Sequence, residues 1–192
     1  MPAEIRNLIN LKSLTIDIHT LSLPKEMGNL VNLEKLDICS DSLELPKEIG
    51  DLVNLESLHL NHRSNLSEFP KEIEKLTNLK ELYISCQKLK KLSKEIGDLT
   101  NLEKLFIINC DSLEKLPREI GDLYNLEKLY ISCNNLEELP HEIRKLTNLK
   151  KFDITFTKNE NSRVIWQTFY IDCNELKKLP EEVRNLTKFK TK

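Results

Sequence analysis

The chain has 192 residues, of which 29 are lysine or arginine and 31 are aspartate or glutamate, so its formal net charge is -2. Such a balance provides no basic field for phosphate backbones, and nucleic acid is therefore not an expected partner. No apolar stretch approaches the roughly 20 residues that span a bilayer, so we expect no membrane insertion. The five cysteines are an odd number without disulfide-framework spacing, which favours reduced thiols and a cytoplasmic location.

The seven prolines and four glycines fall at two fixed positions of one repeating unit. Each glycine follows a proline by four residues, except Gly97, which follows Ser93. This regularity predicts a single repeat domain over residues 1–192. The predicted units are 1–22, 23–44, 45–68, 69–91, 92–115, 116–138, 139–178 and a truncated 179–192.

The unit at 116–138 illustrates how each copy folds. Leu129 and Ile131 alternate with polar or exposed types, which is the period of a strand with one buried face. Consecutive strands should stack about 4.8 Å apart in one parallel sheet. Pro117 suits the start of a short turn or helix, and Gly121 is expected to permit a left-handed exit from it. Because no unit buries its leucines alone, stability must come from neighbouring units.

The sequence resembles a known repeat family. The second half of that unit, LxxLxIxxNxL from Leu126 to Leu136, resembles the leucine-rich repeat signature. The run LPKEIGDLVNL, from Leu45 to Leu55, is similar to the repeats of Ras-binding scaffold proteins and their plant relatives. The unit from Leu102, with Cys110 in place of asparagine, looks like the repeats of plant disease-resistance receptors. The resemblance covers nearly all of the chain except about 155–168.

The resemblance implies an α/β leucine-rich repeat solenoid, or horseshoe. It implies a parallel sheet on the concave face and short helical or extended returns on the convex face. It also implies a non-enzymatic module that binds a partner protein on the concave sheet, with a small GTPase as one possible partner. The fold is shared by proteins of many functions, so the site has to be sought in individual residues.

Asparagine at the position of Asn134 can bridge backbone groups of adjacent turns. This position also carries Asn174, but Gln87 and Cys110 replace it in other units. The sequence therefore predicts an irregular ladder at this position, and it predicts that Cys110 is buried and inert.

The residue between the two buried strand positions should lie at the middle of the exposed sheet face. Down the stack this central row reads Thr15, Asp37, His59, Tyr83, Phe106, Tyr130, and then either Asp153 or Tyr170. The flanking residues are Glu81, Lys104 and Lys128 on one side, and Ser85, Ile108 and Ser132 on the other. Aromatic side chains are common anchors at interfaces, so the central row with Glu81, Lys104 and Lys128 is the predicted partner-binding site. The alternative is that the aromatic residues stack on one another and only stabilise the sheet.

The seventh unit is longer than the others. Its 40 residues exceed the 23 of the preceding unit by 17. The segments 155–157 and 164–168 are rich in β-branched and aromatic residues, which predicts a β-hairpin or a bulged loop. Such an insertion serves either as a contact arm or as a tolerated excursion of the chain.

No set of serine, histidine and acidic residues recurs at a spacing that would converge, so we predict no catalytic, metal or cofactor site. The leading hypothesis is a protein-interaction module in intracellular signalling or immune-type recognition. One alternative is the substrate-recognition part of a larger enzyme such as a ubiquitin ligase. Another is a structural protein that self-associates through uncapped ends.

Overall fold

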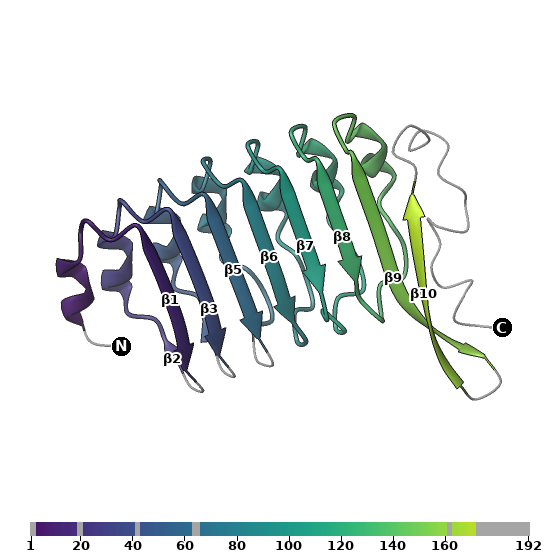
Figure 1. Ribbon diagram of the computed structural model, residues 1–192, viewed down its shortest axis with the longest axis horizontal. Helices are drawn as coiled ribbons and strands as arrows, with labels where there is room; N and C mark the ends of the chain where they lie inside the picture. The colour runs from purple at the N-terminus through teal and green to yellow at the C-terminus, as the bar shows by residue number, and fades with distance from the viewer. Residues whose placement is uncertain (1–2, 19–20, 41–42, 63–65, 161–162, 172–192) are drawn as a thin grey trace.

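The computed structural model describes residues 3–18, 21–40, 43–62, 66–160 and 163–171. Its main sheet has eight strands in the order β1-β3-β5-β6-β7-β8-β9-β10 (Figure 1). The strands are β1 (Ser13–Ile18), β3 (Lys35–Ser40), β5 (Ser57–His62), β6 (Glu81–Cys86), β7 (Lys104–Ile108), β8 (Lys128–Ser132), β9 (Lys151–Glu160) and β10 (Arg163–Ile171). The pairs from β1 to β9 are parallel. A second, two-stranded sheet joins β2 (Leu21–Ser22) to β4 (Leu43–Glu44).

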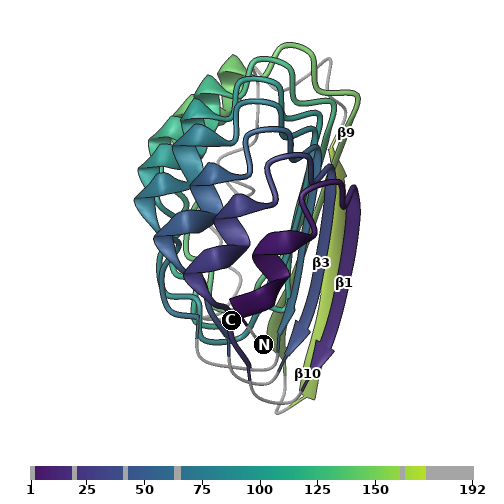
Figure 2. The same ribbon diagram turned by 90° about the vertical axis from the view of Figure 1, so that its left-hand side faces the viewer.

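A row of short 3-10 helices forms the second layer of the molecule, behind the open sheet (Figure 2). The helices are η1 (Ala3–Asn7), η2 (Lys25–Asn29), η3 (Lys47–Asp51), η4 (Lys71–Lys75), η5 (Lys94–Asp98), η6 (Arg118–Asp122) and η7 (His141–Lys145). The predicted solenoid, with a sheet on one face and short helical returns on the other, is confirmed. The predicted eighth unit, 179–192, lies outside the described residues.

The core lies between the two layers and repeats in every unit. In the unit of η6 and β8, Ile120, Leu123, Leu126 and Leu129 are fully buried. Burying a leucine stabilises the folded state by about 1.5–3 kcal/mol, and each unit shares this core with its neighbours.

Proline starts these helices as the sequence predicts. Pro46, for example, precedes η3 with φ of -70° and ψ of 154°, and its side chain makes no cap hydrogen bond. Ser93 stands at the same position before η5 with φ of -59° and ψ of 144°. Its Oγ accepts a hydrogen bond from the backbone N-H of Glu95 at 3.3 Å. The serine therefore replaces the fixed φ of proline with a side-chain cap.

The predicted left-handed exit at the glycines is wrong. All four glycines are described, and none has a positive φ. Their role is close packing between units: a Cβ on Gly121 would lie 2.4 Å from the carbonyl oxygen of Glu142 in the next helix. Among the described residues, the positive φ belongs to a non-glycine residue, Asn109, at 54°.

The insertion in the seventh unit forms a hairpin, the first of the two predicted alternatives. Strands β9 and β10 pair antiparallel, with Tyr170 opposite Asp153. The sequence left open whether Asp153 or Tyr170 continues the central row. Both do, because β10 adds a strand to the sheet beyond β9 rather than competing for its place.

Within the described ranges, no helix is long and apolar enough to cross a membrane.

Candidate functional site on the sheet face

The central row of the sheet face is in direct register across the eight strands. Its members are Thr15, Asp37, His59, Tyr83, Phe106, Tyr130, Asp153 and Tyr170. The exposed fraction of these residues ranges from 8% for Asp153 to 78% for Tyr170. The structure therefore brings the predicted residues Asp37, His59, Tyr83, Phe106, Tyr130 and Tyr170 into one line.

Four rings of this row form an aromatic ladder: His59, Tyr83, Phe106 and Tyr130. Successive ring centroids are 5.6, 6.0 and 5.0 Å apart. The last pair, Phe106 and Tyr130, is stacked with an interplanar angle of 18°. All four side chains are half-buried, so each ring packs against its neighbours in the row and keeps part of its surface accessible. The ladder can stabilise the sheet and contact a partner at once.

A charged network closes one end of the ladder. The two carboxylate oxygens of Glu81 lie 2.9 Å from Nε2 of His59 and 2.8 Å from Nζ of Lys104. Partial burial opposes ionisation of Glu81, but the hydrogen bonds from Lys104 and His59 outweigh it and lower the pKa of the carboxyl group. The same contact raises the pKa of Lys104. Glu81 is therefore held as an anion between two donors.

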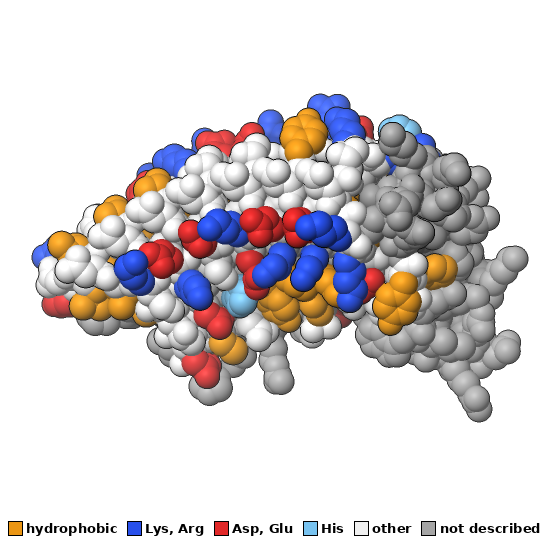
Figure 3. All heavy atoms as spheres, turned by 45° about the horizontal axis from the view of Figure 1, so that its top comes forward, with side chains coloured by type: hydrophobic (Ala, Val, Ile, Leu, Met, Phe, Trp, Pro, Cys, Tyr) orange, Lys and Arg blue, Asp and Glu red, His pale blue; other side chains and the backbone are white. Residues whose placement is uncertain are grey.

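A lysine row borders the ladder on the side of Glu81. Lys104, Lys128 and Lys151 are directly opposite one another on β7, β8 and β9. Figure 3 shows lysine side chains beside an apolar patch on this side of the molecule. Nζ of Lys151 lies 4.9 Å from the ring centroid of Tyr130 and 3.3 Å from the carboxylate of Asp153. The pKa of Lys151 is raised, mainly by its hydrogen bond to Tyr130 and secondly by its hydrogen bond to Asp153.

The opposite border of the ladder is neutral. It comprises Ser85, Ile108 and Ser132 on β6, β7 and β8, and Thr155 and Thr168 on the hairpin. Ser85 is buried and accepts from the Asn109 side chain at 3.5 Å. The hydroxyl groups of Thr155 and Thr168 lie 2.9 Å apart. The face therefore has an aromatic centre, one cationic border and one uncharged border.

The structure contains a regular ladder of asparagine side chains that the sequence analysis did not predict. In six units, an asparagine side-chain N-H donates to a backbone carbonyl of the preceding unit at 2.7–2.9 Å. The donors are Asn32, Asn54, Asn78, Asn101, Asn125 and Asn148. The prediction placed a ladder at Asn134, but the buried Oδ1 of that side chain has no hydrogen-bond partner. The fixed spacing of Leu-x-Asn-Leu was the available signal.

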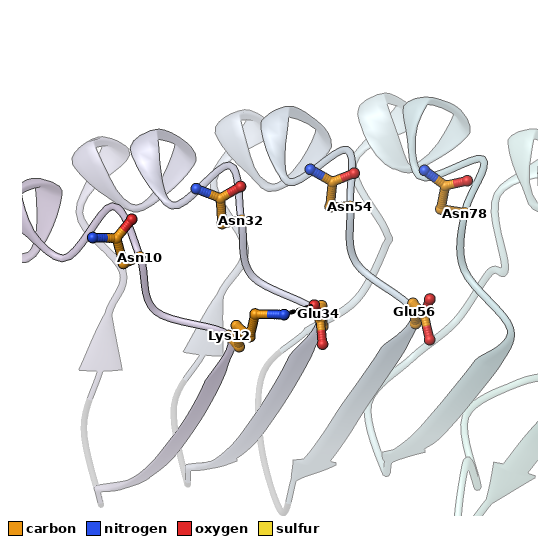
Figure 4. A pocket seen from close by; sticks show the side chains of 7 residues that line it. All are labelled: Asn10, Lys12, Asn32, Glu34, Asn54, Glu56 and Asn78. Carbon is orange, nitrogen blue, oxygen red and sulfur yellow. Dashed lines mark hydrogen bonds and ion pairs between the residues drawn. The ribbon is translucent and has the colours of Figure 1, made fainter.

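The asparagine ladder lines an open groove beside the sheet (Figure 4). The part between Asn10 and Asn78 has a volume of about 520 Å³, and charged side chains form its other wall. There Nζ of Lys12 lies 2.7 Å from the carboxylate of Glu34. The groove continues toward Asn125 with a volume of about 460 Å³. Its charges are largely paired with one another, so it is a weaker candidate for a site than the sheet face.

Three thiols lie at or next to this position: Cys110 replaces the asparagine, and Cys86 and Cys133 lie one residue before it in their units. The Cys110 thiol donates to the carbonyl of Ile84 at 3.8 Å, and the Cys133 thiol donates to that of Ile107 at 3.6 Å. The backbone N-H of Cys86 in turn donates to Sγ of Cys110 at 3.5 Å. All three cysteines are buried, which confirms the predicted burial of Cys110, and burial raises the pKa of the Cys86 thiol. These contacts give the cysteines a structural role. Among the described residues, no cluster of three or more His, Cys, Asp or Glu side chains could hold a metal ion.

The geometry and the comparisons define the class of protein. The leucine-rich repeat region model matches residues 2–114, and a single leucine-rich repeat matches residues 125–146. The chain belongs to the leucine-rich repeat family. A leucine-rich repeat protein of Leptospira interrogans has a similar structure with a TM-score of 0.71 and 39% identity, covering 83% of this chain and 41% of that protein. The chain thus spans about two fifths of the length of that relative.

Two further solved structures share the fold. An internalin of Listeria monocytogenes has a TM-score of 0.60 and 22% identity, covering 78% of this chain and 43% of its own. The Toll–Spatzle complex of Drosophila has a TM-score of 0.62 and 23% identity, covering 78% and 20% respectively. Comparison with curated protein sequences gives no match. At these identities the two structures show the fold alone.

Proposed function

We propose that the chain binds a partner protein on the exposed face of its sheet, centred on the aromatic ladder. The observation that supports this most is the in-register stack of His59, Tyr83, Phe106 and Tyr130, in which every ring stays partly exposed. Half-exposed aromatic side chains held in place by their neighbours lose little entropy when a partner covers them.

The order of side chains across the strands supports the same face. Apolar residues such as Leu105 and Ile107 fill the core on one side of β7, while Phe106 between them faces outward. A residue needed only for the core would occupy the buried positions. The context that we propose, cytoplasmic signalling or immune-type recognition, rests on the resemblance of the repeats.

The test uses a displayed random peptide library selected on the wild-type protein. Binding of the recovered peptides is then measured on the variant Tyr83→Ser/Phe106→Ser/Tyr130→Ser. We expect this variant to lose binding by about tenfold or more. The control is Val31→Ser/Val53→Ser/Tyr124→Ser, which removes three side chains of 44–53% exposure from the turns between the helices and the strands. It should bind as the wild type does.

Thermal melting separates binding from stability. The ladder variant is expected to melt lower, because each cross-strand pair contributes about 0.2–1 kcal/mol. Binding is therefore measured at a temperature where both variants are folded by circular dichroism. Equal binding of the peptides to the ladder variant and to the wild type would contradict the proposal and leave the ladder a purely stabilising element.

A further inference from the structure

We infer that the segment bound on this face is acidic, and that Lys128 is its principal charged anchor. The inference rests on the proposed function of the sheet face and adds the chemistry of the partner. The segment is an extended stretch of a partner protein that lies across β7, β8 and β9. Its carboxylates meet the lysine row, and its apolar side chains cover Phe106 and Tyr130.

The first argument is that the lysine row costs stability in the free protein. Lys104 and Lys128 are directly opposite each other on adjacent strands, and so are Lys128 and Lys151. Like charges in this relation destabilise a sheet, since their separation is close to the strand spacing of about 4.8 Å. A local arrangement that opposes folding and is only partly compensated is expected at a functional site.

The second argument is that only the ends of the row are compensated. Lys104 is bound by Glu81 at 2.8 Å, and Lys151 lies 3.3 Å from Asp153. The middle residue, Lys128, is exposed, and its ammonium group forms no ion pair or hydrogen bond with any described residue. An anion placed over β8 would therefore find one free ammonium group between two that are already oriented.

The remaining charged groups beside the row do not replace such a ligand. Glu127 precedes Lys128, but its carboxylate is bound by Nζ of Lys150 at 2.5 Å. Glu103 precedes Lys104 and makes no ion pair with a described residue. Its charge raises the pKa of Lys104 less than the contact with Glu81 does. Both lie just before their strands begin, away from the central row.

The third argument concerns the shape of the ligand. An extended chain places alternate side chains on one face about 6.4–6.8 Å apart, so two acidic residues in alternation can bracket Lys128. Because the segment runs obliquely over the strands, its further residues reach the stacked rings of Phe106 and Tyr130, which lie 5.0 Å apart, and then the neutral border. Glu81 and Asp153 flank the row and would repel a continuous phosphate backbone, which favours an acidic peptide over nucleic acid.

The experiment repeats the peptide selection on charge variants of the protein and measures the enrichment of acidic residues in the selected peptides. Peptides of about a dozen residues, long enough to cross the three strands, are selected on the wild type and on Lys128→Glu. The control is Lys35→Glu, which reverses an exposed lysine at the same strand position of β3, opposite Ser13 and Ser57. We expect the wild type and the control to enrich aspartate and glutamate about twofold or more over the starting library, and Lys128→Glu to lose that enrichment.

A single selected peptide then gives the magnitude. Its variant with Asn and Gln in place of Asp and Glu should bind the wild type about tenfold more weakly at about 50 mM salt, and the difference should shrink at about 300 mM. The substitution Lys128→Met, which keeps the aliphatic stem, should leave the melting temperature unchanged or raise it, because it removes the like-charge contacts.

The possible results distinguish the two proposals. Peptides that need the aromatic ladder but carry no acidic enrichment would overturn the inference and leave the proposed function standing. Peptides that ignore the ladder would overturn both. A marked loss of stability in Lys128→Met would overturn the inference by giving that lysine a structural role. Equal binding of an oligothymidylate, with the same dependence on Lys128, would overturn it in favour of nucleic acid.

Discussion

The carbonyl oxygen of Glu72 lies 2.4 Å from the point where a Cβ atom on Gly50 would stand. The glycine belongs to η3 and the glutamate to η4 of the next unit, so the two helices approach as closely as a hydrogen side chain allows. The same relationship recurs between Gly121 and Glu142, also at 2.4 Å. Glycine at this position therefore sets the distance between successive units rather than the direction of the chain.

Replacing Gly50 with alanine should destabilise the protein by about 1–3 kcal/mol, because backbone atoms of η4 cannot yield without moving the helix. Urea denaturation followed by circular dichroism measures the change. The control is Gly28→Ala, whose nearest atoms would lie 3.1 Å from the added Cβ and need to shift less. Equal costs at the two positions would show that helix spacing does not explain the glycines.

The asparagine ladder predicts a second stability effect. Asn101→Ala removes the hydrogen bond to the carbonyl of Thr77, which is 2.7 Å long, and should cost about 0.5–1.5 kcal/mol. Asn10→Ala is the matched control. Asn10 occupies the same position in the first unit, where no described residue accepts a hydrogen bond from it. The prediction fails if both variants have the same denaturation midpoint.

The repeat could be predicted from the sequence because proline, glycine and leucine recur at fixed positions, and this periodicity also placed Phe106 and Tyr130 on the exposed face. Contacts between units were less accessible. The role of the glycines depends on the distance between helices, which no single unit encodes. The hydrogen bond between His59 and Glu81 joins different positions on neighbouring strands, and register alone gives no rotamer. Lys151 could be placed in the lysine row only once the structure showed that β9 follows β8 in the sheet.

The cap at Ser93 predicts that alanine and proline at this position differ in their cost to stability. Ser93→Ala removes the hydrogen bond to the N-H of Glu95 and should cost about 1 kcal/mol. Ser93→Pro also loses the cap, but the native φ of -59° suits proline, which lowers the entropy of the unfolded chain and recovers about 0.4–1 kcal/mol. The melting temperature of Ser93→Pro should therefore exceed that of Ser93→Ala. The reverse order would show that the backbone at this position does not accept proline.

The network at Glu81 makes stability depend on pH. Hydrogen bonds from Lys104 and His59 lower the pKa of Glu81 in the folded state, so folding favours its ionised form. The corresponding stabilisation is fully present above the unfolded pKa, which is about 4.3 for a glutamate, and is lost as the pH falls through the folded value. Glu81→Gln should accordingly be less stable than the wild type at pH 7, and the gap should narrow below about pH 4. Denaturation midpoints over this range test the prediction, with Glu103→Gln as a control for the loss of one exposed charge. A gap that is constant with pH would exclude the ionised carboxylate as its cause.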